Sequence, residues 1–121
     1  KKKDHIYKLK IQGINLADLL KEEYSELLPR FSYLKIDTEG YDKAIIESLY
    51  DIITTHRPVI QAEMHKKLNL QERTAFYNIL EKAGYHCYKY NSDEERQGDP
   101  ITVKEVMRWD HFDIFAIPIT G

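Results

Sequence analysis

Two short segments of the sequence place carboxylates and a histidine at the ends of apolar runs. They are residues 35–40 (KIDTEG) and residues 63–65 (EMH). Carboxylates and imidazoles are the side chains that most often move protons in enzymes, and both also hold polar ligands by hydrogen bonds. The two segments therefore predict a polar binding or acid–base site. Its candidate catalytic residues are Asp37, Glu39, Glu63 and His65.

Each candidate also has a structural interpretation that the sequence leaves open. Asp37, at a strand end, could cap the helix that follows. Glu39 could be the acid in the first turn of that helix, where the helix dipole stabilises a carboxylate by ~0.3–1 kcal/mol. His65 could be an exposed loop residue. Glu63 lies inside an apolar run, where an unpaired carboxylate is costly, so a role in a site is favoured for it.

Three carboxylates and a histidine could also bind a divalent cation. Their spacing contains no tight ligand motif, so we predict a site without a metal. The remaining histidines are scattered and are assigned no role: His5, His56, His86 and His111. The five glycines stand apart from one another, so no phosphate- or cofactor-cradling loop is recognisable in the sequence.

The elements that must position these residues follow from hydrophobic periodicity. Apolar residues alternate over residues 7–12, which predicts a half-buried strand. Short apolar runs predict further strands over residues 33–37, 59–64, 85–90 and 112–118. Residues 91–100 are polar and without periodicity, so we expect a loop there.

Helical spacing of apolar residues predicts helices over residues 16–26 and 41–55. Asn69 and Glu72 have the spacing of a capping box, and Gly84 is expected to stop the helix that they begin. Thr102 and Glu105 repeat the capping-box spacing and predict a short helix to about residue 109.

This order of elements predicts an α/β domain. Strands that alternate with helices form a parallel sheet with crossover helices. The strand over residues 112–118 follows the previous one without a long helix, so it could pair antiparallel at an edge. Ligands of such sheets bind outside the carboxyl ends of the parallel strands, where Asp37 and Glu63 would converge.

Composition limits the class of protein further. The 121 residues are 42% hydrophobic and 31% charged, with a formal net charge of −2. Such a balance is typical of a globular domain and gives no indication of nucleic-acid binding. No apolar run is long enough for a membrane span. Cys87 is the only cysteine, and we expect it to be a reduced thiol in a strand, which fits a cytoplasmic location.

Four segments in the same order resemble the FkbM-type methyltransferases. Residues 33–42 (YLKIDTEGYD) are similar to that family's Lys-Ile-Asp-x-Glu-Gly-x-Glu signature. The other three segments are residues 14–20 (INLADLL), 57–65 (RPVIQAEMH) and 83–85 (AGY). Asn15, Ala17 and Asp42 depart from the usual residues, and these departures are expected to leave Asp37, Glu39 and Glu63 untouched.

The resemblance implies a class I methyltransferase fold, which is a Rossmann-like sheet, with S-adenosylmethionine as methyl donor. It also implies O-methylation of a hydroxyl on a sugar, glycolipid or secondary metabolite. The family's glycine-rich loop and ribose-binding acid would lie upstream. Residues 1–121 are therefore expected to be the C-terminal portion of one such domain, supplying the acceptor side, with the cofactor-binding half absent.

Two hypotheses follow for function. In the first, the residues at the strand ends orient a carbohydrate or other small-molecule acceptor, and one of them removes its proton. In the second, the chain is a folded, non-catalytic module. Without upstream strands, the strand over residues 33–37 would then have a bare edge, which favours a homo-oligomer.

Overall fold

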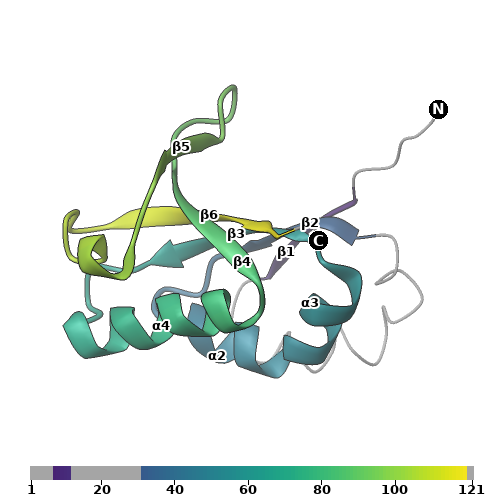
Figure 1. Cartoon of the computed structure of the whole chain (residues 1–121), viewed down its shortest axis with the longest axis horizontal. Coiled ribbons are helices and arrows are strands. Elements are labelled where there is room, and N and C mark those ends of the chain that lie inside the picture. Colours follow the sequence, from purple (N-terminus) through teal and green to yellow (C-terminus); the bar gives the residue numbers. More distant parts are fainter. Residues whose placement is uncertain (1–6, 12–30, 120–121) are drawn as a thin grey trace.

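The computed structural model describes residues 7–11 and 31–119 of the chain. They form a six-stranded sheet with the order β1-β2-β3-β6-β4-β5, shown in Figure 1. The strands are β1 (Tyr7–Ile11), β2 (Phe31–Ile36), β3 (Val59–Met64), β4 (Tyr85–Tyr90), β5 (Gln97–Pro100) and β6 (Phe112–Pro118). The predicted helix over residues 16–26 lies outside the described residues.

The sheet contains more antiparallel strand pairs than predicted. β1, β2 and β3 pair in parallel, whereas β6 pairs antiparallel with both β3 and β4. β4 therefore runs in the same direction as β1 to β3, and its carboxyl end lies at the same edge of the sheet. The antiparallel direction of the last strand was predicted correctly. Its expected edge position was wrong, because β6 lies between β3 and β4.

The expected bare edge on residues 33–37 was also wrong. β2 is hydrogen-bonded to β1 on one side and to β3 on the other. β2 therefore offers no bare edge through which a second chain could pair. In the described part of the chain, the two outer strands are β1 and β5.

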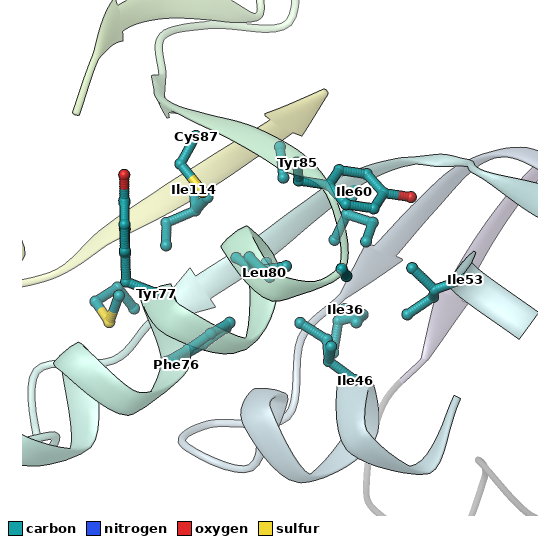
Figure 2. Close-up of a cluster of buried hydrophobic side chains, with 14 of the residues drawn as sticks. Ile36, Ile46, Ile53, Ile60, Phe76, Tyr77, Leu80, Tyr85, Cys87 and Ile114 are labelled. Atoms are coloured by element: carbon teal, nitrogen blue, oxygen red, sulfur yellow. The ribbon is translucent and has the colours of Figure 1, made fainter. Parts of the chain in front are cut away.

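Helices α2 (Asp42–Ser48), α3 (Tyr50–His56) and α4 (Leu70–Lys82) all cover one face of the sheet (Figure 1). Their apolar side chains pack against those of the strands, as Figure 2 shows for Leu80 of α4 near Ile114 of β6. Alternate residues of β2, β3, β4 and β6 point into this core, such as Ile60, Ala62 and Met64 of β3. The intervening strand residues point to the opposite face, on which no α-helix of the described residues lies and which we call the helix-free face.

The helix predicted over residues 41–55 is divided in two. Leu49, whose φ is −101° and ψ is 13°, separates α2 from α3. Neither glycine nor proline marks the break. Ile45, Leu49 and Ile53 continue to point into the core across it, so the hydrophobic pattern carries no sign of the interruption.

Both predicted capping boxes are present. In α4, the Asn69 side chain accepts from the Glu72 backbone N–H, and the Glu72 side chain accepts from the Asn69 N–H. Thr102 and Glu105 form the same pair at a single 3₁₀ turn, η2 (Val103–Glu105), instead of a helix extending to residue 109. The predicted loop over residues 91–100 contains β5, which pairs with β4.

Candidate active site

The carboxyl ends of β2 and β3 bring predicted site residues to one edge of the sheet. Asp37 directly follows β2, and Glu63 is the penultimate residue of β3. Both positions alternate with core residues, so both side chains belong to the helix-free face. The negative charge of Asp37 raises the pKa of Glu63, which places the two carboxylates within electrostatic reach. The predicted convergence of these two residues is thus supported by the structure.

Asp42 anchors the turn that carries this edge. Its side chain is 1% exposed. Oδ1 accepts hydrogen bonds from the backbone N–H of Thr38, at 3.0 Å, and from the Thr38 hydroxyl. Oδ2 accepts from the backbone N–H of Glu63, at 2.6 Å. One carboxylate therefore fastens the turn after β2 to the end of β3.

Burial raises the pKa of Asp42 to about 6, although the hydrogen bonds from Thr38 and Glu63 favour its charged form. This opposition has a simple physical cause. Loss of hydration destabilises the charged carboxylate more than the hydrogen bonds from these donors stabilise it. Asp42 therefore titrates near the lower end of the neutral range.

Glu63 is the most unusual group at this edge. Its side chain is 14% exposed, and its Oε1 atom is buried without a hydrogen-bond partner among the described residues. Burial raises its pKa, and the charges of Asp37 and Asp113 add to the effect. The His111 ring and the Glu39 backbone N–H oppose it. A carboxylate in this position takes up a proton more readily than an ordinary glutamate, as a general base must.

His111 completes the surroundings of Glu63, although sequence reasoning assigned it no role. Its Nε2 lies 3.4 Å from Glu63 Oε2, and its ring meets the His65 ring edge-to-face at 5.0 Å. The Nδ1 atom of His111 accepts from the Lys66 backbone N–H, and that of His65 accepts from the Lys67 N–H. His111 could not be recognised from sequence, because 48 positions separate it from Glu63 and the β3–β6 pairing brings them together.

The pair of histidines is accessible to solvent. His111 is 41% exposed at its side chain, and His65 is partly exposed. The pKa of His65 is lowered, first by partial burial and then by the charge of His111. His65 thus adjoins Glu63 through the His111 ring, which contacts both side chains.

Glu39 and Gly40 form the tip of the turn between β2 and α2. Both have positive φ, 55° and 109° respectively. Helix α2 begins at Asp42, and Tyr41 at its N-cap provides no side-chain hydrogen bond. Asp37 therefore does not cap this helix, and the acid in its first turn is Asp42 instead of Glu39. Glu39 is exposed at the rim of the site.

A polar network continues from the site across the helix-free face. The Tyr33 hydroxyl donates to Gln61 Oε1 at 2.6 Å, and Gln61 Nε2 donates to Asp113 Oδ2 at 2.8 Å. Asp113 is the register partner of Glu63. The Arg96 guanidinium lies over the Tyr33 ring, 4.9 Å from its centroid. Tyr33 and Gln61 are each 5% exposed, so this network is a fixed part of the floor beside Glu63.

Neither a metal nor a reactive thiol is indicated at this edge. Within residues 7–11 and 31–119, no cluster of three or more metal-ligating side chains has a geometry suitable for an ion. Cys87 is buried in β4, and burial raises its pKa to about 12. Its thiol is therefore protonated, as expected for a structural cysteine.

None of the described helices is both long and apolar enough to cross a membrane.

An α/β sheet with paired acidic groups at the carboxyl ends of its parallel strands is the arrangement in which enzymes of this architecture bind their ligands. A profile of the methyltransferase FkbM domain matches residues 3–90. The chain belongs to the FkbM methyltransferase family. Comparisons with curated proteins and with solved structures found no match. The family match ends with β4, so His111 and Asp113 lie beyond it.

Proposed function

We propose that this protein is an S-adenosylmethionine-dependent O-methyltransferase and that Glu63 is the base that deprotonates the acceptor hydroxyl. S-adenosylmethionine would supply an electrophilic methyl group. The hydroxyl oxygen forms the new bond to that methyl carbon while the carbon–sulfur bond breaks. The hydroxyl proton passes to the Glu63 carboxylate. His111 then carries this proton to solvent.

The observation that supports this role is the state of Glu63. One of its oxygens has no donor among the described residues, and its pKa is raised toward the range in which a base works best. The other oxygen faces a partly exposed imidazole at 3.4 Å, which provides a route for the proton. Asp42, in contrast, accepts three hydrogen bonds from the protein.

Asp37, Glu39 and His65 have supporting roles in this proposal. Asp37 would orient the acceptor by accepting a hydrogen bond from a second hydroxyl, which suits a sugar or other polyol. Glu39 lies at the exposed rim and would contact the outer part of the acceptor. His65 would support the ring of His111, which it contacts edge-to-face.

We extend the proposal to the fold and the methyl donor. The strand directions fit a Rossmann-like class I methyltransferase sheet, in which an antiparallel strand is inserted beside parallel ones. Among the described residues, the glycines form no loop that would cradle S-adenosylmethionine. We therefore assign these residues the acceptor side, with a carbohydrate or small alcohol as acceptor, and propose no donor contact among them.

The decisive experiment compares Glu63→Gln with the wild type in methyl transfer. Radiolabelled S-adenosylmethionine would be offered with neutral glycosides and simple alcohols, using methyl α-glucoside as the reference acceptor. Loss of the base should lower kcat by about 10²–10⁴-fold. Glu94→Gln, at an exposed position of the β4–β5 connection, is the matched control and should retain full activity. A Glu63→Gln enzyme with wild-type turnover would exclude Glu63 as the base.

The pH dependence of kcat offers a second check. Because the pKa of Glu63 is raised, the rate should increase with pH through a range above that of an ordinary glutamate and level off once the carboxylate is ionised. Asp37→Asn removes the charge that helps to raise this pKa, so the rising limb should move to lower pH. An unchanged pH midpoint of the rising limb would show that the charge of Asp37 does not affect the pKa of Glu63.

Calorimetry separates the enzyme from the non-catalytic alternative. Titration of S-adenosylmethionine into this chain measures whether these residues alone bind the donor. Micromolar affinity would place donor contacts here and revise the assignment to the acceptor side. Absence of binding agrees with that assignment, and the radiolabel assay with the intact enzyme then decides between a catalytic and a non-catalytic protein.

A further inference from the structure

Arg73 is a buried cation whose partners are all backbone carbonyl groups. Its side chain lies within α4 and is 1% exposed. The guanidinium has five N–H donors, and all five are used. The acceptors are the carbonyl oxygens of His65, Leu68, Val106, Trp109 and Asp110, at distances between 2.5 and 3.1 Å. Burial lowers the pKa of Arg73, which shows that its charge is partly desolvated.

These carbonyl groups belong to two loops that are distant in sequence. His65 and Leu68 lie in the turn between β3 and α4, whereas Val106, Trp109 and Asp110 lie between η2 and β6. The first loop carries the His65 ring. The second leads directly into His111, which follows Asp110. One planar group therefore joins the two segments that hold the histidine pair.

We infer that Arg73 is a positioning residue for the proposed reaction, because its guanidinium fixes the loop before β6 so that His111 lies against Glu63. This inference rests on the proposed function of Glu63 and His111. A planar fork with five fixed donors can determine the relative position of two loops, whereas a single ion pair leaves them free to rotate. The Phe112 ring, 6.0 Å from the guanidinium carbon, packs beside it and limits its movement.

Arg57 provides a matched control within the same chain. Its guanidinium also binds backbone carbonyl groups, those of Ala83, Gly84 and Ile119, and it also lies over an aromatic ring, that of Tyr85 at 5.0 Å. Arg57 precedes β3, however, so it lies at the edge of the sheet opposite to Glu63. Loss of Arg57 should lower stability without moving the histidines.

The test compares Arg73→Met with Arg57→Met. Trp109 is the only tryptophan in the sequence, so its fluorescence reports directly on the loop that Arg73 holds. In Arg73→Met its emission should shift to longer wavelength, and the nuclear Overhauser contact between the His65 and His111 rings should disappear. Arg57→Met should retain both signals. Retention of both in a folded Arg73→Met protein would overturn the inference.

Kinetics separate positioning from a general loss of stability. With the best acceptor from the glycoside and alcohol panel, kcat of Arg73→Met should fall about 100-fold, as expected when a proton-carrying group is misplaced by roughly 1 Å. The KM for S-adenosylmethionine should stay unchanged. Arg57→Met, measured well below its unfolding temperature, should keep wild-type kcat. Equal losses of kcat in both variants would contradict a specific role of Arg73.

Arg73→Lys keeps the experiment decisive if Arg73→Met does not fold. Lysine retains the charge but cannot reach all five carbonyl groups, so kcat should fall by roughly 10-fold. If Arg73 acts through His111, adding His111→Ala to Arg73→Lys should reduce kcat less than it does in the wild type. Additive losses would overturn the inference. A different outcome is that Arg73→Met loses the contact between the histidine rings while the wild type transfers no methyl group. That result would keep Arg73 as the residue that positions His111 and would reject the proposed function.

Discussion

Burial of the Asp42 carboxylate destabilises its ionised form. Its pKa, raised to about 6 from 3.8, means that the folded protein binds more protons than the unfolded chain between these pH values. Stability contributed by this group is therefore complete at low pH and is lost as pH rises through about 6. The energetic cost of ionising Asp42 in the folded protein is roughly 2–3 kcal/mol.

The variant Asp42→Asn isolates this contribution. Asparagine cannot ionise, so only the wild type loses this contribution as pH rises. The difference in unfolding free energy, wild type minus variant, should therefore decrease by roughly 2–3 kcal/mol between pH 4 and pH 7. Its amide nitrogen would face the backbone N–H of Glu63, which lowers the stability of the variant at every pH. Urea unfolding at a series of pH values measures the difference. A difference that is constant with pH would contradict the raised pKa.

Part of the candidate site could be predicted from single residues. Asp37 and Glu63 follow apolar strands, so their convergence depends only on strand direction, and the structure agrees with it. Asp42 could not be recognised, because its role comes from three hydrogen bonds that form only after α2 packs on β3. The alternative in which Asp37 caps the following helix is excluded for a related reason. Two residues with positive φ delay the start of the helix to Asp42.

At the scale of elements, two glycines with positive φ should differ in their tolerance of a side chain. A Cβ at Gly40 would meet only the flexible Lys67 side chain, at 3.7 Å, whereas a Cβ at Gly84 would lie 3.0 Å from the Arg57 guanidinium. Gly40→Ala should therefore cost about 1–2 kcal/mol through backbone strain alone. Gly84→Ala should cost more, because it also displaces the clamp between α4 and β3. Equal losses in urea unfolding would show that the Arg57 contacts add nothing.

Elements with strong local signals were predicted closely from the sequence. Strands β3, β4 and β6 have the predicted limits, and the capping box fixed the start of α4. The position of β6 could not be obtained in this way. A periodic pattern identifies a strand but not its neighbours, and here the pairing is decided by how Ile114 and Ala116 complete the core between β3 and β4. β5 was missed because QGDP has no apolar alternation.

At the scale of the whole molecule, the strand order predicts a gradient of protection against amide exchange. β6 pairs with β3 over residues 112–116 and with β4 over residues 114–118, and Ala116 is the register partner of both Ile60 and Cys87. β5 is short, largely exposed and paired on one side. Amides of β3 and β6 should therefore exchange slowest and those of β5 fastest. Native-state hydrogen exchange measures this order, and equal rates in β5 and β6 would contradict it.

The placement of β6 has a consequence for synthesis. The ribosome produces β1 to β5 before the strand that joins β3 to β4, so β4 and β5 remain detached from the parallel strands until residues 112–118 emerge. During that interval Ile114 and Ala116 are missing from the core, so the apolar side chains of α4 that share this core with β6 stay partly uncovered. The same late strand brings His111 to Glu63, so the candidate site forms only after β6 has paired with β3.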